Sequence, residues 1–261
     1  MKIAIVNQKG GVGKTTTAIN LSTAIAATGK SVLLIDIDPQ GNASTGLGID
    51  RANRACSIYD VLIGNSDIAE ATIATRVAGL AIVPSTVALS GAEVELVALV
   101  RRMYRLRTAL AAAPPYDFVM IDCPPSLGLL TLNALVAADS VLVPLQCEFF
   151  ALEGLSQLLG TIERVRAGPN ADLTVLGVVL TMIDRRNRLS DQVSADVRAV
   201  MGAQVFDTAI PRNVRLSEAP SHGLPALLYD LRCSGSAAYL ELAREVLQRA
   251  AAHLSLKVSN G

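Results

Sequence analysis

The feature that most constrains the fold of this chain is a glycine-rich segment directly after its first apolar run. Residues 3–6 are apolar, residues 9–16 read KGGVGKTT, and helix-forming residues follow. Glycines let backbone N–H groups turn inward and approach a phosphate closely, and the N-terminus of the following helix adds a positive dipole. Lys14 is placed to neutralise the β- and γ-phosphates of a nucleotide, and the hydroxyl of Thr15 is placed to bind Mg²⁺. This order of strand, loop and helix predicts an α/β domain that binds a nucleotide.

Short apolar runs alternate with stretches of helical composition along the rest of the chain. The expected strands are residues 3–6, 32–35, 80–83, 118–121, 141–143 and 175–180, and the expected helices are about 14–28, 90–111, 128–137, 151–167, 190–202 and 236–253. Because the apolar runs are continuous, both faces of the sheet are expected to be buried, as in a doubly wound, mostly parallel sheet flanked by helices. With 261 residues and no repeat or linker, we expect one domain over residues 1–261, with a flexible tail from about residue 255. Residues 41–54, rich in Gly, Asn, Ser and Thr, are predicted to form a functional loop.

Acidic residues follow two of the expected strands. Asp36 and Asp38 come after the second strand, and Asp122 comes after residues 118–121. The carboxyl ends of parallel strands meet at the edge of the sheet where doubly wound folds bind ligands. One carboxylate there can bind Mg²⁺ through water while another orients the attacking water, and Asp122 stands in the Walker B position near the metal. A simple turn at Asp38-Pro39 is the alternative interpretation of that segment.

The charge of the chain excludes a global attraction to nucleic acid. Lys+Arg and Asp+Glu both number 23, so any such binding must come from local patches. Residues 185–215 hold such a patch, with six arginines against three acidic residues, and a solvated charged loop is the alternative. Four scattered cysteines disfavour a disulfide framework or a zinc ribbon and indicate a reducing cytoplasm. No apolar run approaches the ~20 residues needed to span a bilayer.

The glycine-rich segment has an unusual form that resembles the deviant Walker A motif of the ParA/MinD superfamily. A second lysine, Lys9, precedes the glycines, and Gln8 stands where the usual motif has glycine. The chromosomal ParA/Soj branch is similar to this chain at the acidic segments described above, and also at residues 146–154 and at residues 210–223. The resemblance therefore covers about residues 2–250. It implies an ATPase that uses ATP and Mg²⁺, with Lys9, Lys14 and Asp38 as catalytic residues. It places Lys9 at the nucleotide of a partner subunit and makes Asp38 the residue required for hydrolysis.

The resemblance also implies a set of binding residues. The implied nucleotide-binding residues are Gly10, Gly11, Val12, Gly13, Lys14, Thr15, Thr16, Met182, Pro211 and Asn213, and the metal-binding residues are Thr15, Asp36 and Asp122. Within this set, Met182 and Pro211 would contact the adenine faces and Asn213 its edge, with an ordinary strand end and turn as the alternative. The absence of a guanine-reading N-K-x-D or T-K-x-D motif favours ATP over GTP.

The resemblance further implies partners. An ATP-dependent homodimer would bind double-stranded DNA without regard to sequence, and a ParB-type centromere-binding protein would stimulate hydrolysis. The implied DNA-binding residues are Arg185, Arg186, Arg188, Arg212 and Arg215. The expected location is the cytoplasm, in association with the nucleoid.

Two other functions stay open at this point. A MinD-like membrane-positioning ATPase would need a basic amphipathic tail, whereas the last expected helix carries an apolar stripe suited to core packing, with Ala243, Val246, Leu247, Ala250 and Leu254 on it. We therefore expect no membrane partner. A metabolic ligase or reductase would use the same phosphate loop, but Cys123 and Cys147 do not match a cluster-binding pattern, and neither enzyme explains the arginine segments.

Overall fold

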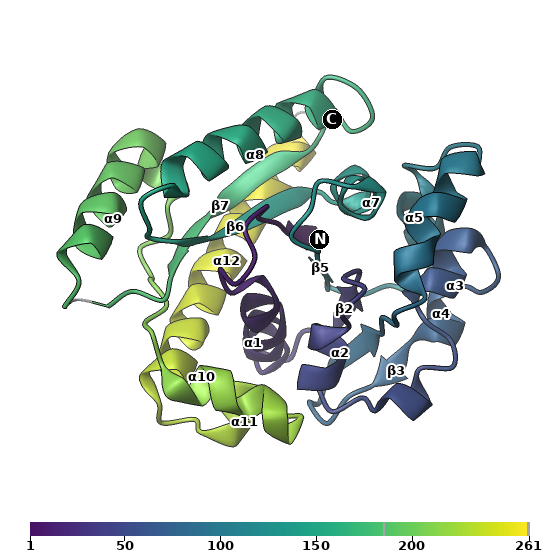
Figure 1. The fold of residues 1–261 in the computed structure, drawn as a ribbon, viewed down its shortest axis with the longest axis horizontal. Coiled ribbons are helices and arrows are strands. Elements are labelled where there is room, and N and C mark those ends of the chain that lie inside the picture. Colours follow the sequence, from purple (N-terminus) through teal and green to yellow (C-terminus); the bar gives the residue numbers. More distant parts are fainter. Residues whose placement is uncertain (185, 260–261) are drawn as a thin grey trace.

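The strands form one sheet with the order β3-β4-β2-β5-β1-β6-β7 in the computed structural model, which describes residues 1–184 and 186–259 (Figure 1). Six strands run parallel, and the two-residue edge strand β3 is antiparallel to β4. Each of the six expected strands is confirmed. The strands are β1 (Lys2–Ile5), β2 (Val32–Asp36), β3 (Ile73–Ala74), β4 (Leu80–Val83), β5 (Phe118–Asp122), β6 (Ser140–Gln146) and β7 (Thr174–Thr181).

Helices cover both faces of the sheet, because successive strand residues point to opposite sides and both sets are apolar. On β2, Leu33 and Ile35 pack into one core, while Val32 and Leu34 pack into the other. The first core is covered by α3 (Ile58–Ile63), α4 (Ile68–Ala71), α5 (Leu89–Ala98), α6 (Arg105–Ala111), α7 (Leu129–Ala137), α8 (Ala151–Arg166) and α9 (Arg188–Met201). The second is covered by α1 (Lys14–Ala26), α2 (Asn42–Gly46), α10 (Val214–Glu218), α11 (Ala226–Tyr229) and α12 (Ser234–Ser259). This is the doubly wound α/β fold that the apolar runs predict.

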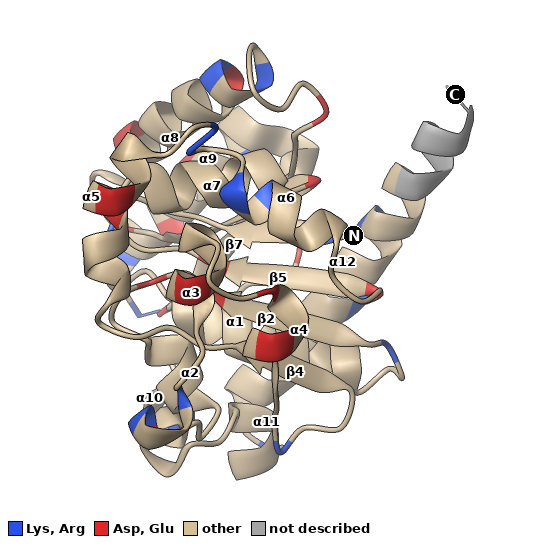
Figure 2. Cartoon of the chain, turned by 90° about the vertical axis from the view of Figure 1, so that its right-hand side faces the viewer, with Lys and Arg blue, Asp and Glu red and all other residues tan. Residues whose placement is uncertain are grey.

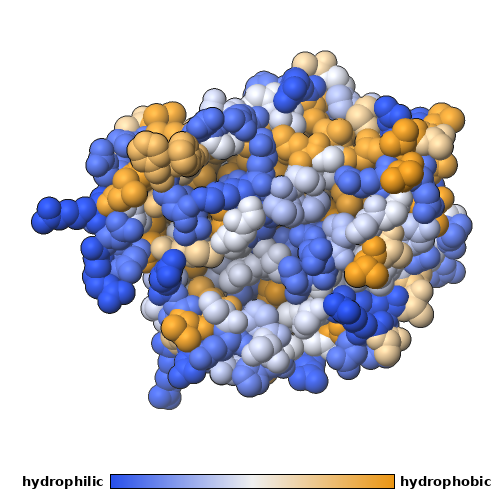
Figure 3. Space-filling view, viewed as in Figure 1, coloured by the Kyte–Doolittle hydropathy of each residue, from blue (hydrophilic) through white to orange (hydrophobic). Residues whose placement is uncertain are grey.

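Outer helices carry charged residues of both signs. Figure 2 shows acidic residues on α3, α4 and α5 and basic residues on α6 and α10. Figure 3 shows hydrophilic and hydrophobic residues mixed over the face seen in Figure 1, with the hydrophobic ones in separate patches. Neither sign of charge covers a whole face in Figure 2, which agrees with the balanced composition.

The single helix expected over residues 90–111 is wrong, because the segment forms two helices with a break between them. Backbone at Arg101 has a φ of 56°, which an α-helix excludes. The break is held by Asn133 of α7, whose Nδ2 donates to the carbonyl of Arg102 at 2.9 Å and whose Oδ1 accepts from the N–H of Leu106 at 3.2 Å. A side chain from another helix thus supplies the bonds that a continuous helix would have made itself.

The other expected helices are present within a few residues of their predicted ends. Helix α12 packs on the second core through Ala243, Val246 and Ala250, as its apolar stripe predicts, while the side chain of Leu254 lies outside the described part. The helix continues to Ser259, and residues 260–261 of the expected tail are outside the described residues. Within the described part of the chain, no helix has the length and apolar character to cross a membrane.

Candidate nucleotide-binding site

The glycine-rich loop joins β1 to α1 at the carboxyl edge of the sheet. Gly11 and Gly13 have φ values of 75° and 90°, a left-handed conformation that glycine adopts without strain. Gly13 is also the residue before α1, and no side chain caps the helix there, so the first N–H groups of α1 face the loop. Val12 anchors the loop because it is buried and its carbonyl accepts a 2.8 Å hydrogen bond from Thr181 Oγ1 at the end of β7.

Lys14 is the first residue of α1, and its amine reaches back to the glycine-rich loop. Its side chain is buried, and its Nζ donates to the carbonyl of Lys9 at 2.9 Å. Burial lowers the pKa of the Lys14 amine, while the nearby Asp122 raises it. The amine therefore occupies the position where a phosphate group could replace the Lys9 carbonyl as its partner.

Two carboxylates lie at the ends of neighbouring strands, and one of them, Asp122, is close to Lys14. Asp36 on β2 and Asp122 on β5 are register partners, and both are fully buried. Asp36 Oδ2 accepts hydrogen bonds from Ser44, at 2.8 Å from its N–H and 2.7 Å from its hydroxyl, and Oδ1 accepts from the N–H of Asp38 at 3.3 Å. Burial raises the pKa of Asp36 to about 6. Asp36 thus fixes the start of α2, and both of its oxygens already have partners.

Asp122 is different, because no hydrogen bond of good geometry from the described residues reaches either of its buried carboxylate oxygens, although the Thr15 hydroxyl is close enough to lower its pKa. Burial, followed by the charge of Asp36, raises its pKa well above the ordinary value. A buried carboxylate beside the Thr15 hydroxyl fits a Mg²⁺ ion, which takes one or two carboxylates together with phosphate and water oxygens. No group of three or more His, Cys, Asp or Glu side chains forms a metal cage within the described residues. Three residues are predicted to bind the metal. The geometry fits Asp122 as a ligand and places the Thr15 side chain beside it, while Asp36 holds the surrounding loop.

Asp38 lines a cavity beside the phosphate loop. Its Oδ1 accepts from the N–H of Gln40 at 2.9 Å, and its carbonyl accepts from the N–H of Gly41 at 2.9 Å. Asp38 therefore begins a turn and also lines the cavity, so the two interpretations of this segment are compatible. The cavity is about 300 Å³ and is lined by Gly10, Gly11, Gly13, Lys14, Thr15, Thr16, Asp38, Gln40, Asn42, Pro125 and Met182.

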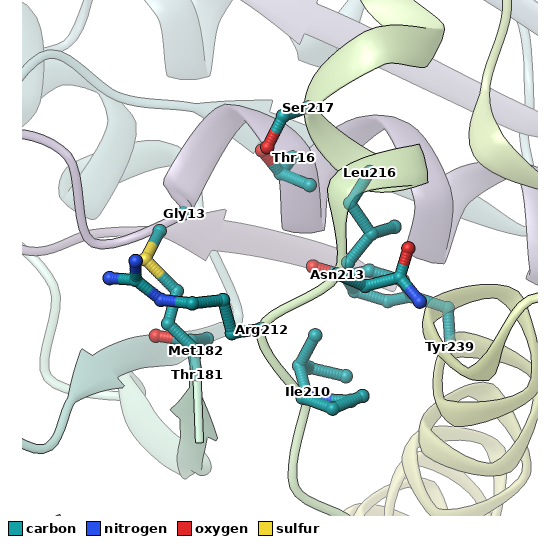
Figure 4. A pocket seen from close by; sticks show the side chains of 11 residues that line it. Gly13, Thr16, Thr181, Met182, Ile210, Arg212, Asn213, Leu216, Ser217 and Tyr239 are labelled. Atoms are coloured by element: carbon teal, nitrogen blue, oxygen red, sulfur yellow. The ribbon is translucent and has the colours of Figure 1, made fainter. Parts of the chain in front are cut away.

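A second cavity has a volume of about 260 Å³, and Figure 4 shows the side chains that line it. It is lined by Gly13, Thr16, Thr181, Met182, Ile210, Pro211, Arg212, Asn213, Leu216, Ser217 and Tyr239. Gly13, Thr16 and Met182 line both cavities, so the two form a continuous cleft around the start of α1. The cleft brings together the phosphate loop and the three residues expected to contact a base.

The base end of the cleft is built by a short pairing of two segments. Ile183 and Pro211 pair in parallel, with hydrogen bonds of 3.0 Å from the Ile183 N–H to the Ile210 carbonyl and 3.1 Å from the Arg212 N–H to the Ile183 carbonyl. Met182 has a φ of 53°, a rare conformation for a non-glycine residue, and such strain is found mostly at functional sites.

Asn213 has a structural role at this end of the cleft. Its Oδ1 accepts from the N–H of Arg215 at 2.8 Å and caps α10, while its Nδ2 donates to Ser234 Oγ at 2.8 Å. The amide still has one acceptor lone pair and one N–H for a base. Leu216, Ser217 and Tyr239 are lining residues that the sequence did not single out. Leu216 and Ser217 on α10 lie within the family-like residues 210–223, whereas Tyr239 on α12 lies outside every motif.

The basic segments come together, but their arginines differ in their contacts. Arg186 pairs with Asp184 at 3.0 Å, and Arg215 pairs with Glu218 at 2.8 Å. Hydrogen bonds from Arg186 lower the pKa of Asp184 to about 2. Arg188 and Arg212 are exposed and make no salt bridge within the described part of the chain, while Arg185 lies outside the described residues. Arg212, expected to bind DNA, also lines the cleft, and Figure 4 shows it extending toward Met182 and Gly13.

Lys9 stands at the rim of the site rather than in the cleft. Its Nζ forms an ion pair with Glu148, which follows β6. Half of the Lys9 side chain is exposed.

Known proteins resemble the chain over nearly its whole length. A family model described as an AAA domain matches residues 1–175. The chromosome partitioning protein ParA of Caulobacter vibrioides is 63% identical over 250 residues, which cover 95% of this chain and 94% of that protein. The sporulation initiation inhibitor protein Soj of Bacillus subtilis is 55% identical, with 94% and 97% covered.

Solved structures resemble it as well. Cobyrinic acid a,c-diamide synthase from Mycobacterium smegmatis, with a bound ATP analogue and magnesium, matches with a TM-score of 0.83 and 39% identity over 95% of this chain and 94% of that one. The cell division ATPase MinD of Pyrococcus furiosus matches with a TM-score of 0.79 and 26% identity, with 95% and 98% covered.

Proposed function

The chain belongs to the family of ParA and Soj chromosome-partitioning ATPases within the ParA/MinD superfamily, and from this premise we propose that it is an ATP-driven switch that binds DNA. With Mg²⁺ and ATP in the cleft, two copies pair face to face and bind double-stranded DNA without regard to sequence. Hydrolysis, stimulated by a ParB-type partner, separates the copies and releases the DNA. The protein works in the cytoplasm on the nucleoid.

The observation that carries this proposal is the continuous cleft from the phosphate loop to Met182 and Pro211. A nucleotide in this cleft would have its phosphates over the start of α1 and its base beside Met182 and Pro211. The buried carboxylate of Asp122, close to Thr15 and Lys14, supports a cation at the phosphate end. Relatives solved with an ATP analogue or ADP together with magnesium support the same cofactors here.

The residues of the cleft divide the chemistry between them. Lys14 exchanges the Lys9 carbonyl for a phosphate oxygen and neutralises its charge. Thr15 and Asp122 would hold Mg²⁺, which supplies charge stabilisation at the phosphates. Asp38 keeps one carboxylate oxygen on the Gln40 N–H and presents the other to the attacking water. The Asp36 side chain holds the Asp38 backbone in place through the 3.3 Å hydrogen bond.

The DNA part of the proposal rests on the two arginine segments. The pairing of Ile183 with Pro211 places them side by side, and the chain as a whole has no net charge that would attract DNA. Arginine contacts to phosphates give affinity without reading bases. A dimer presents the patch twice on one surface, so binding follows the nucleotide state through avidity.

The test is binding to random-sequence duplex DNA at moderate salt with Mg²⁺-ATP, with Mg²⁺-ADP and without nucleotide. We expect DNA binding only in the presence of Mg²⁺-ATP, and we expect the Arg186→Glu variant to bind DNA more weakly than wild type. The matched control is Arg166→Glu, because Arg166 is also exposed and ion-paired, with Glu163, but lies on α8. Equal binding in all three states, or no binding at all, would overturn the proposed switch.

The two alternative functions, a metabolic enzyme and a MinD-like positioning ATPase, have less support than this function. The solved diamide synthase is 39% identical to this chain, against 63% and 55% for the ParA and Soj relatives. A chain without DNA binding in any state would direct attention to amide formation on a small acid, or to a MinD-like role tested with liposomes.

A further inference from the structure

We propose that Glu148 is a positioning residue that holds Lys9 on its own subunit until a second subunit takes Lys9 over. The inference rests on the proposed function, in which Lys9 acts at the nucleotide of the partner copy. It adds a contact within one subunit that competes with the contact between subunits.

The ion pair joins two segments that are far apart in the sequence. Lys9 lies in the phosphate loop, and Glu148 lies between β6 and α8. The side chains are 50% and 44% exposed, so water can replace either partner when the pair opens. The contact is therefore suited to opening and closing rather than to holding the fold together.

The backbone on both sides of the pair is fixed to the same strand end. The Lys9 N–H donates to Asn7 Oδ1 at 3.0 Å, and the buried Asn7 donates through Nδ2 to the Pro144 carbonyl of β6 at 2.7 Å. The Glu148 N–H donates to the Gln146 carbonyl at 2.9 Å, also on β6. With both backbones anchored, the side chains are the moving parts of this contact.

There is room for the Lys9 side chain to move. A cavity of about 300 Å³ lies beside the pair, and its lining includes Lys9, Gln146, Phe150, Glu153 and Gln157. The cavity opens next to the phosphate loop, since Asn7, Gln8 and Val12 also line it. Release of Lys9 thus needs no rearrangement of the core.

Phosphate binding is linked to the Lys9–Glu148 ion pair through the carbonyl oxygen of Lys9. Lys14 Nζ donates to the carbonyl of Lys9 at 2.9 Å, so the same residue holds Glu148 with its side chain and Lys14 with its backbone. A phosphate in the loop draws the Lys14 amine away and frees that carbonyl. The peptide of Lys9 then loses one of its restraints at the moment when ATP arrives, which favours opening of the Glu148 pair.

The pair opposes dimer formation, and the size of the effect follows from its exposure. An exposed ion pair shifts an equilibrium by about 1.5- to 5-fold. A symmetric dimer opens two such pairs. Removing the Glu148 charge should therefore lower the dissociation constant of the nucleotide-bound dimer by about 2- to 25-fold.

The test is the dimer dissociation constant measured by analytical ultracentrifugation with Mg²⁺ and a non-hydrolysable ATP analogue. We expect Glu148→Gln to dimerise more tightly than wild type and Glu148→Asp to behave like wild type. Glu153→Gln is the matched control, because it removes the same charge beside the same cavity without touching Lys9. Thermal unfolding midpoints equal to wild type show that each variant is folded.

The outcomes separate the two proposals. A wild type that stays monomeric with the analogue contradicts the proposed function itself. A wild type that dimerises, with Glu148→Gln equal to Glu153→Gln or weaker, overturns the role of Glu148 and leaves the proposed function standing. Tighter dimerisation in Glu148→Gln but not in Glu153→Gln supports both the proposed function and the role of Glu148.

Discussion

Asp36 and Asp122 face each other on neighbouring strands in a fully buried site, and this arrangement makes the stability of the metal-free chain depend on pH. Burial raises the pKa of Asp36 from 3.8 to about 6, and burial together with Asp36 raises the pKa of Asp122 further. The folded state therefore holds these protons more tightly than the unfolded chain does. Their contribution to stability is fully present below the ordinary pKa and is lost as the pH rises through the folded value.

The magnitude follows from the Asp36 shift. A difference from 3.8 to about 6 corresponds to about 3 kcal/mol in full, of which about 1 kcal/mol appears between pH 7 and pH 5. Asp122 adds to this in the same direction. Asp117 and Asp184 have lowered pKa values, so their opposite contributions change mainly below pH 5.

The assay is urea unfolding in EDTA at pH 7, 6 and 5. With a denaturant slope of about 2–3 kcal/mol per molar, the midpoint should rise by about 0.4 M or more between pH 7 and pH 5. Asp122→Asn should raise the midpoint at pH 7, because it removes an ionisable group whose charged form is disfavoured by burial and by the neighbouring Asp36. The exposed Asp172→Asn serves as the control. A wild-type midpoint that is flat or falls from pH 7 to pH 5 would refute the reasoning.

Two further predictions concern the segment that holds Asp36 and Asp38. Arg54 is buried and donates to the carbonyls of Ile49 and Ser85 at 2.7 and 3.0 Å. Arg54→Met should leave these buried acceptors unpaired and lower the free energy of unfolding by about 3 kcal/mol, which corresponds to a thermal midpoint about 6–12 °C lower. An unchanged midpoint would contradict this role. Gly48 has a φ of 75°, and a Cβ there would lie 2.9 Å from the Gly223 carbonyl oxygen, whereas at Gly29 the φ is 84° and a Cβ would meet nothing within 4 Å. Gly48→Ala should therefore destabilise the protein by about 1–3 kcal/mol more than Gly29→Ala in urea unfolding, and equal losses would show that the close approach has no cost.

The strands and the phosphate loop are predictable from sequence because their signals are local. A continuous apolar run, a glycine-rich turn and a helix-forming run specify one arrangement by themselves, and the acids that follow β2 and β5 meet because parallel strands share an edge. The base end of the cleft is predictable only through the family resemblance, since nothing in residues 181–184 or 210–213 indicates that they pair.

The features that sequence does not predict are set by contacts between distant residues. The break after α5 contains no proline or glycine and depends on Asn133 of α7. The segment 41–54, predicted as a loop, contains α2 because Asp36 bonds Ser44 and Arg54 binds the surrounding carbonyls. The pairing of Lys9 with Glu148 joins positions 139 residues apart and has no sequence signal.

The central claim is that hydrolysis resets a DNA-binding state formed by ATP, and Asp38→Ala tests it most directly. Phosphate release with Mg²⁺-ATP and binding to random duplex DNA are measured in parallel, with Asp50→Ala as a control because Asp50 is an exposed acid in the same segment. The account predicts that Asp38→Ala lowers phosphate release by about 10²-fold or more while ATP-dependent DNA binding persists. Loss of DNA binding together with hydrolysis, or normal hydrolysis in the variant, would contradict it.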